Sequence, residues 1–149
     1  MKIRPATIHD IDALCALEQR AFSPDKYHLM KRAQYRHLLT KGNADLIVAL
    51  DGEKLCGMVM LLYRAGGKMA RMYSIAVDPD YQGGAVGKTL FEAAQAKVIE
   101  RNLKGLIIEI RTDNQRHLER YQKHGYKIDR QVADYYPDGS PCYKLKKIF

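Results

Sequence analysis

The stretch DPDYQGGAVGKTLFEAA, from Asp78 to Ala94, places a glycine-rich turn directly before a helical pattern. The apolar residues of that pattern recur on one helical face, at Leu90, Phe91, Ala94 and Val98. A helix is therefore expected over Gly84 to Arg101. Its first turn carries unpaired backbone N–H groups and the positive end of the helix dipole, which attract anions. Because Gly83, Gly84 and Gly87 would let a phosphate approach those amides, the stretch is a candidate phosphate-binding turn, and the alternative is an ordinary glycine-rich turn from a strand to a helix.

The Gly-Lys-Thr of this turn invites comparison with the nucleotide-cleaving P-loop, G-x-x-x-x-G-K-[ST]. Counting back from Gly87, the first glycine of that motif would have to be residue 82, which is Gln82. The turn also follows the third or fourth expected strand and not the first one. The sequence therefore argues against a nucleotide hydrolase and leaves open a cofactor that is held by its phosphate end.

Short apolar runs before this turn predict an antiparallel meander. Three strands are expected at Asp45–Leu50, Lys54–Tyr63 and Met69–Val77, separated by turn signals at Asp51-Gly52 and Gly66-Gly67. Consecutive strands joined by such short turns pair in the antiparallel direction.

The remaining elements are predicted on both sides of the meander. Before it, a strand at Lys2–Pro5 and a capping box at Thr7–Asp10 lead into a helix that ends near Ser23-Pro24, and a second helix lies within Tyr27–Leu39. After the glycine-rich turn and its helix come a strand at Gly105–Arg111, a helix at Asn114–His124 and two terminal strands. This order predicts an α/β fold in a single domain over residues 1–149. Its mixed, mostly antiparallel sheet would have about six to seven strands, with helices on both faces.

Composition limits the classes of function. The 149 residues, of which 46% are apolar and 28% charged, suit a globular protein with one core. No apolar run reaches the about 18–20 residues that a membrane span requires. The first residues, MKIRPATIHD, lack the apolar core of a secretion signal. We therefore expect a cytoplasmic protein with no membrane partner.

Cysteine, histidine and charge limit the possible cofactors and partners. Cys15, Cys56 and Cys142 are far apart and odd in number, so reduced cysteines are expected, and no histidine spacing predicts a metal site. The formal charge of +8 favours phosphate-bearing or acidic partners. Because the basic residues are spread along the chain, apart from KLKK at residues 144–147, nucleic acid is not expected as the main partner.

The segment YSIAVDPDYQGGAVGKTL, from Tyr73 to Leu90, resembles the cofactor signature of the GNAT superfamily of acyl-CoA-dependent N-acetyltransferases. The signature is [QR]-x-x-G-x-[GA] at the start of a helix, after a strand that ends in V-x-P. Gln82 and Gly87 match it, whereas Ala85 stands where the pattern has its first glycine.

A second segment, LIIEIRTDNQRHLERYQKHGY from Leu106 to Tyr126, is similar to the other signature of that superfamily. The pattern is E-[VI]-R-x-x-N at a strand end, followed by N-x-x-A-x-x-L-Y-x-x-x-G-F along a helix. Five residues fall in register: Glu109, Arg111, Asn114, Tyr121 and Gly125. His117 replaces the usual Ala and Arg120 the usual Leu, so the packing of this helix is expected to differ.

The same residues have chemical meaning without the resemblance. Glu109 lies in an otherwise aliphatic strand, where partial desolvation makes a carboxylate a stronger base. Asn114 and Tyr121 are seven residues apart and share one stripe of a helix. The alternatives are a Glu109 that faces solvent or pairs with Arg111, a Tyr121 that is a half-buried aromatic, and an Asn114 that is a plain N-cap.

A resemblance over nearly the whole chain, including IRPAT, LEQRAF and YYPDG, points to the ribosomal-protein-alanine (RimI-like) branch of the GNAT superfamily. It implies acetyl-CoA as cosubstrate, no metal, Glu109 as general base and Tyr121 as general acid. The cofactor-binding residues that it implies are Ile75, Ala76, Val77, Gln82, Gly83, Gly84, Ala85, Val86, Gly87, Lys88, Asn114 and Tyr121.

The acceptor is expected to be a primary amine, foremost a protein or peptide N-terminus bound by a monomer or homodimer. Tyr27, Tyr35, Tyr135 and Tyr136 are the candidates to wall its pocket. The alternatives are a small-molecule amine acetyltransferase, a non-catalytic acyl-CoA sensor and, last, a basic nucleic-acid-binding domain.

Overall fold

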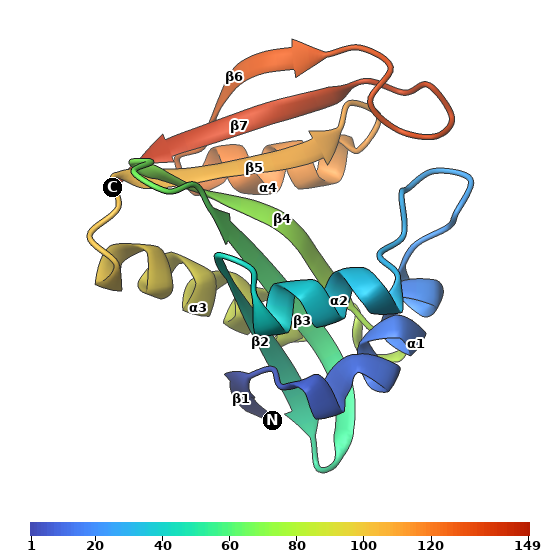
Figure 1. Ribbon diagram of the computed structural model, residues 1–149. Coiled ribbons are helices and arrows are strands. Elements are labelled where there is room, and N and C mark those ends of the chain that lie inside the picture. Colours follow the sequence, from blue (N-terminus) through green and yellow to red (C-terminus); the bar gives the residue numbers. More distant parts are fainter.

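A computed structural model describes residues 1–149, and it has one seven-stranded sheet between two layers of helices (Figure 1). The strands are β1 (Lys2–Pro5), β2 (Ala44–Asp51), β3 (Lys54–Tyr63), β4 (Met69–Val77), β5 (Gly105–Arg111), β6 (Lys127–Val132) and β7 (Cys142–Ile148). The helices are α1 (Ile11–Ala21), α2 (Arg32–Thr40), α3 (Val86–Glu100) and α4 (Gln115–Lys123), with short 3₁₀ turns at Ile8–Asp10 and Pro79–Tyr81. No helix is long and apolar enough to cross a bilayer.

The sheet has the order β1-β2-β3-β4-β5-β7-β6. Only β4 and β5 pair in parallel, and all other neighbours are antiparallel. The predicted mixed, mostly antiparallel sheet is thus confirmed, as is the meander of β2, β3 and β4. The parallel pair arises because α3 carries the chain back across the sheet between β4 and β5.

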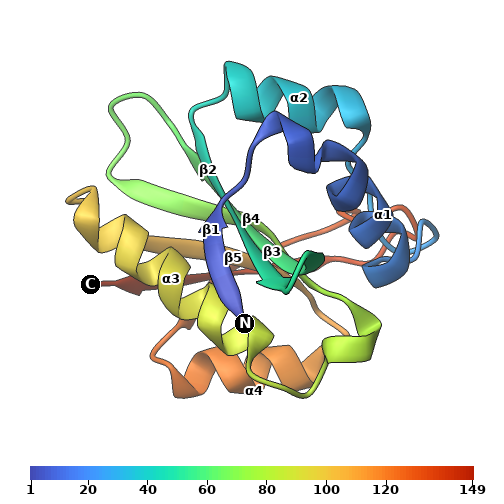
Figure 2. The ribbon, with the colours of Figure 1, turned by 90° about the horizontal axis from the view of Figure 1, so that it is seen from below.

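Two apolar cores lie on opposite faces of the sheet, and the helices divide between them. α3 and α4 cover one face and α1 and α2 the other, as Figure 2 shows from below. In β3, Val59 and Leu61 enter the α3/α4 core, whereas Met58 and Met60 enter the α1/α2 core. A strand buried on both faces needs apolar residues at every position, which is why β2 and β3 contain continuous apolar runs.

The segment before α2 differs from the prediction. The sequence predicts a helix within Tyr27–Leu39, but α2 begins at Arg32 and the preceding residues form a turn and an irregular segment. Two side chains fix this start. The Glu18 carboxylate accepts the Met30 N–H at 3.2 Å, and the Gln34 side chain accepts the Lys31 N–H at 2.8 Å. Both bonds satisfy backbone donors outside the helix, so the helix starts after them.

A bulge in β4 separates this strand from β5. The pairing of β3 with β4 slips at Tyr73, because Met60 pairs with Ser74 while Leu61 pairs with Met72. Before the bulge Ala70 and Met72 face the α3/α4 core, and after it Ile75 and Val77 do. A bulge bends its strand and increases the local twist.

The bend coincides with the end of pairing between the two parallel strands. β4 pairs with β5 only from Met69 to Met72, opposite Gly105 to Ile108. Beyond these residues β4 pairs only with β3 and β5 only with β7, so each strand has a free edge. The two strands diverge from this point, as the green and orange-yellow arrows in Figure 1 do.

Gly105, at the start of β5, is predicted to be essential where β5 pairs with both β4 and β7. A Cβ there would lie 2.1 Å from the Lys147 carbonyl oxygen and 3.1 Å from the Ile148 Cα, both backbone atoms of the paired strand β7. Gly105→Ala should therefore lower the free energy of unfolding by about 2–3 kcal/mol. Denaturant unfolding followed by circular dichroism measures this change.

Gly84→Ala is the matched control for that measurement. Its Cβ would meet the Tyr81 carbonyl oxygen at 3.5 Å, an ordinary contact, and the backbone φ of Gly84 is not positive. The control should change stability by less than about 0.5 kcal/mol. Equal stability of the two variants would contradict the close approach of β5 and β7.

Candidate active site

A cleft of about 360 Å³ opens where β4 and β5 separate. Its walls come from β4 (Tyr73, Ser74, Ile75), β5 (residues 108–111) and α4 (His117, Tyr121) with its N-cap Asn114. The segment after α1 adds Tyr27, His28 and Met30, and the loop before β7 adds Tyr135 and Tyr136. Seven of the residues proposed from the sequence therefore share one cleft: Ile75, Glu109, Asn114, Tyr121, Tyr27, Tyr135 and Tyr136.

Tyr35 is the candidate that the structure does not bring to the cleft. It lies on α2, fully buried, and its hydroxyl donates to Glu18 Oε1 at 2.7 Å. The position of an aromatic residue in a helical pattern does not tell whether its side chain faces the core or a binding cleft. The expected role of Tyr35 as a pocket wall is therefore corrected to a core residue that supports α1.

The cleft connects the two faces of the sheet. Leu106, Ile108 and Ile110 of β5 lie in the α3/α4 core, so the alternate residues Glu109 and Arg111 point to the opposite face. Tyr121 of α4 belongs to the α3/α4 side. A continuous sheet would keep Glu109 and Tyr121 apart, and the gap between β4 and β5 lets both line one space.

Glu109 has polar neighbours, and not the aliphatic surroundings that its strand suggested. Its side chain is only 8% exposed, and Arg71 Nε of β4 donates to its Oε1. The Tyr135 hydroxyl donates to Oε2, and Lys144 Nζ lies 3.8 Å from Oε1. Burial and the bond to Glu109 raise the pKa of Tyr135, so this phenol keeps its proton. The alternatives of a solvent-facing Glu109 or a pair with Arg111 are both wrong.

Arg111 instead joins two loops at the mouth of the cleft. Its side chain is 3% exposed, and Nη2 donates to Asp138 Oδ2 at 2.7 Å and to Asp113 Oδ2 at 3.0 Å. Nη1 donates to the Lys26 carbonyl oxygen at 2.9 Å, in the segment that carries Tyr27. The guanidinium holds the pKa of the Asp138 carboxyl well below its usual range. Because a buried cation must be paired, these contacts fix both loops.

Tyr121 is held by aromatic packing but leaves its hydroxyl free. Its ring lies 5.4 Å from the Phe91 ring and 6.0 Å from the Tyr126 ring, between centroids. The hydroxyl makes no hydrogen bond within the protein, and no fully buried polar side-chain atom lacks a partner, so the hydroxyl must retain access to the cleft. Burial raises the pKa of this phenol, which therefore stays protonated.

Asn114 lies at the cleft and also caps α4. Its Oδ1 accepts the His117 backbone N–H at 3.2 Å, the N-cap role that its position suggested. The sequence interpretation assigned no role to Arg111 and His117, which line the cleft, or to Arg71, which bonds to Glu109. A single cation in the otherwise uncharged strand MARMYSIAV was the available signal for Arg71.

The glycine-rich turn lies directly after β4, at the end of the separated strand. The backbone amides from Gln82 to Lys88 donate to no acceptor within the protein, and the first helical bond runs from the Thr89 N–H to the Ala85 carbonyl at 2.9 Å. Gly83 has φ +85°, a conformation that favours glycine, and a Cβ there would meet nothing within 4 Å. Ala85 has φ −86° and ψ −6°, so its position does not require glycine.

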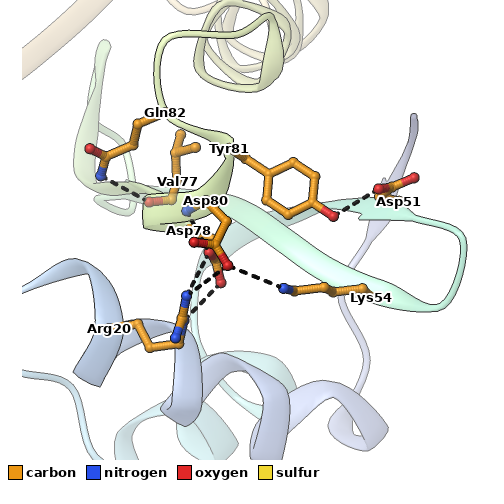
Figure 3. A network of polar contacts seen from close by, with 8 residues as sticks. All are labelled: Arg20, Asp51, Lys54, Val77, Asp78, Asp80, Tyr81 and Gln82. Carbon is orange, nitrogen blue, oxygen red and sulfur yellow. Dashed lines mark hydrogen bonds and ion pairs between the residues drawn. The ribbon is translucent and has the colours of Figure 1, made fainter.

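A polar network fixes the turn to the rest of the molecule (Figure 3). Arg20 of α1 donates from Nε to Asp78 Oδ2 at 2.9 Å and from Nη2 to Asp80 Oδ2 at 3.3 Å. The Tyr81 hydroxyl donates to Asp51 Oδ2 at 2.7 Å, and Gln82 Nε2 donates to the Val77 carbonyl at 3.3 Å. These contacts join α1, the β2–β3 turn and the end of β4. They place the free amides of the turn beside the free edge of β4.

No group of three or more His, Cys, Asp and Glu side chains is arranged to hold a metal ion. The three cysteines are unpaired, and Cys56 and Cys142 are buried. The chemical groups that line the cleft are two carboxylates (Glu18 and Glu109), several phenols, two imidazoles (His28 and His117) and the Arg111 guanidinium.

Comparisons with known proteins agree on one family. The family model described as "Acetyltransferase (GNAT) family" matches residues 11–126. A Bacillus subtilis protein named putative [ribosomal protein bS18]-alanine N-acetyltransferase is 27% identical over 143 residues, which cover 91% of this chain and 87% of that protein. A Sulfurisphaera tokodaii protein named N-alpha-acetyltransferase is 26% identical, over 97% and 90% of the two chains. The crystal structure of the ribosomal-protein-S18-alanine N-acetyltransferase from Escherichia coli superposes with a TM-score of 0.86 at 21% identity, over 99% and 92%.

The Arg20–Asp78 pair is predicted to make stability depend on pH. The Arg20 guanidinium lowers the pKa of Asp78 to about 2, whereas an unfolded aspartate titrates near about 3.9. A lowered folded-state pKa contributes stability above the unfolded pKa, and this contribution is lost as pH falls toward the folded value. Asp78→Asn should therefore be less stable than the unmodified protein at pH about 7, with a difference that closes between pH about 4 and about 2.

Asp80→Asn is the control for this prediction. The Asp80 side chain is 70% exposed although it also contacts Arg20, so its removal should have a small effect at every pH. Thermal unfolding of the three proteins across the pH range measures the differences. A gap between Asp78→Asn and the unmodified protein that stays constant with pH would show that the carboxylate charge does not stabilise the turn.

Proposed function

This chain belongs to the GNAT family of acetyltransferases, and we propose that it moves an acetyl group from acetyl-CoA to the N-terminal α-amine of a protein or peptide. Relatives over most of its length are named N-acetyltransferases, and two are named for protein alanine or N-alpha substrates. One observation carries the proposal for this chain. A carboxylate and a free phenol, Glu109 and Tyr121, reach the same cleft from opposite faces of the sheet, beside a turn with seven free amides.

The turn and β4 support acetyl-CoA as the cosubstrate. Free amides from Gln82 to Lys88, at the N-terminus of the long helix α3, suit the pyrophosphate of CoA. Ile75, Ala76 and Val77 lie on the free edge of β4, where an extended amide chain such as pantetheine can pair like a strand. Asn114 and Tyr121 on α4 would contact the same arm at its thioester end.

The acceptor would enter from the other face of the sheet. Tyr27 and Tyr136 are held there by Arg111, whose guanidinium carbon lies 5.6 Å and 5.0 Å from their ring centroids. Tyr135 lies beside them and bonds to Glu109. An α-amine in a simple peptide titrates near about 7.7–8.0, against about 10.4 for lysine, so it gives up its proton more readily.

The proposed reaction is direct attack of the amine on the thioester. The amine nitrogen bonds to the carbonyl carbon, the C–S bond breaks, and its electron pair stays on sulphur. Glu109 takes the proton that the amine loses, and Tyr121 donates a proton to the departing sulphur. Arg71 and Tyr135 would hold the carboxylate in place, since each bonds one of its oxygens. These roles, like the cofactor contacts, are part of the proposal.

Turnover of acetyl-CoA by the purified protein against a panel of acceptors tests the function. The panel contains N-terminal peptides, the same peptides with a blocked N-terminus and one lysine, polyamines and free amino acids. We expect kcat/KM for free N-terminal peptides to exceed the other values by at least about 10-fold, a difference of about 1.4 kcal/mol in the barrier. A preference for polyamines would replace the proposal with a small-molecule acetyltransferase. Binding of acetyl-CoA without any turnover would replace it with a sensor.

Glu109→Gln tests the proposed base. The amide keeps the shape of the carboxylate but cannot accept the proton, so kcat/KM should fall by about 10²-fold or more. The dissociation constant of acetyl-CoA, measured by calorimetry, should stay within a factor of about 2, because Glu109 is proposed to act on the amine only. The control Glu119→Gln, on the exposed side of α4, should retain full activity. Equal activity of the two variants would remove Glu109 as the base.

A further inference from the structure

His117 replaces the alanine of the family pattern, and the structure turns this histidine into the cleft. Its neighbour Leu118 fills the core on the other side of the helix. His117 lines the cleft between Asn114 and Tyr121, one helical turn before Tyr121. The ring centroids of His117 and Tyr121 are 6.2 Å apart.

The capping residue fixes which ring nitrogen of His117 carries the proton. Asn114 Oδ1 accepts the His117 backbone N–H at 3.2 Å, so the amide oxygen is engaged and Nδ2 is left as a donor. That nitrogen lies 2.9 Å from His117 Nδ1, which must therefore accept. The proton of the neutral imidazole is then on Nε2.

The same contact keeps the ring neutral. Protonation of Nδ1 would set two donors against each other, and a rotation of the Asn114 amide to relieve this would break the helix cap. Burial lowers the pKa of His117, and the charges of Arg120 and Arg116 lower it further. His117 is thus a neutral hydrogen-bond donor at physiological pH.

Two unsatisfied donors therefore adjoin on α4. His117 Nε2 has no partner in the protein, and neither has the Tyr121 hydroxyl. The carboxylates of the cleft are already engaged, Glu18 by Tyr35 and the Met30 amide, and Glu109 by Arg71 and Tyr135. Both donors therefore remain available to an acceptor atom of a ligand that enters the cleft.

We infer that His117 is a second donor to the sulphur atom of the thioester, acting through Nε2–H beside the Tyr121 hydroxyl. This inference rests on the proposed function. As the C–S bond breaks and the electron pair moves to sulphur, Tyr121 gives its proton to the sulphur while His117 donates a hydrogen bond and keeps its proton. The donor stabilises negative charge that develops only as the bond breaks, so it accelerates the step more than it tightens binding.

If His117 donates to the sulphur, it should change the pKa of the bound CoA thiol as well as kcat. A hydrogen bond to the thiolate favours the charged form, so the bound CoA thiol should have a lower pKa than free CoA. His117→Ala, which restores the residue of the family pattern, should raise the pKa of the bound thiol by about 1 and lower kcat by about 10-fold. KM for acetyl-CoA should change little, because the developing charge is absent from the bound thioester.

Matched variants separate hydrogen bonding from packing. His117→Gln keeps an N–H donor, so its kcat and its bound-thiol pKa should lie between those of His117→Ala and the unmodified protein. If His117 only filled space, the added donor would restore neither quantity. His124→Gln, on a histidine at the end of the same helix and outside the cleft, should leave kcat and the thiol pKa unchanged. Ultraviolet absorbance of the thiolate in the CoA complex measures the pKa, independently of turnover.

The tautomer is tested on the protein without ligand. Long-range ¹⁵N spectra should show His117 with a protonated Nε2 and an unprotonated Nδ1. Asn114→Asp keeps a capping oxygen but replaces the amide donor by an acceptor, so it should move the proton to Nδ1 or charge the ring. An Nδ1–H tautomer in the unmodified protein would overturn the inference.

The outcomes distinguish this inference from the proposed function. A protein that binds neither CoA nor acetyl-CoA would remove both. A protein that binds and turns over acetyl-CoA, but whose kcat and thiol pKa are unaffected by His117→Ala, would retain the proposed function and lose only the role of His117. A raised KM with unchanged kcat would also overturn the role, because it would show that His117 holds the cofactor arm equally in the ground state and the transition state.

Discussion

The hydrogen bonds between β4 and β5 end after Met72 and Ile108, and this constraint organises the rest of the molecule. The bulge at Tyr73 bends β4 at that point and gives it a free edge directed toward the glycine-rich turn. On the other strand, Glu109 is the first residue of β5 without a partner in β4. A sheet paired to its end would have no cleft and would hold Glu109 and Tyr121 on separate faces. Interrupted pairing thus creates the space and decides which side chains share it.

Separated strands leave polar groups and charges exposed to a poorly hydrated space, and ion pairs compensate for this. Arg71 is two residues before the bulge and reaches across the opening to Glu109, 38 residues later in the chain. Arg111, at the end of β5, pairs with Asp138 and bonds the Lys26 carbonyl, so the two loops over the cleft share one buried cation. In each pair one partner is buried, Glu109 at 8% and Arg111 at 3% exposure, so removing its counter-charge would leave a buried charge less compensated, which costs more than an exposed pair contributes. The loops therefore have fixed positions although neither contains regular secondary structure.

Local patterns in the sequence predicted most elements of the fold, apart from the start of α2, but not the polar contacts of the site. The runs DLIVAL and KLCGMVMLLY, with Asp51-Gly52 between them, predict the hairpin because burial on both faces requires apolar residues at every position. Spacing likewise placed Asn114 and Tyr121 on one stripe of α4. The partners of Glu109 could not be predicted, since they depend on which strands are neighbours and on the register between them. The prediction that Tyr35 walls the pocket was wrong for a related reason. Helical spacing alone does not reveal that its hydroxyl bonds to Glu18 in the core.

The bulge also has a chemical consequence, because it separates the groups that accept protons from those that donate them. The carboxylate lies on the face of β5 opposite α4, while the Tyr121 and His117 donors lie on α4. An amine that enters from the first face meets a proton acceptor, and a thioester that enters along β4 presents its sulphur to donors. Tyr121 makes no bond to Glu109, so its hydroxyl stays available to the thioester, while Glu109 is held by Tyr135 and Arg71. The interrupted sheet keeps Glu109 and Tyr121 far enough apart to avoid that bond, yet within one cleft.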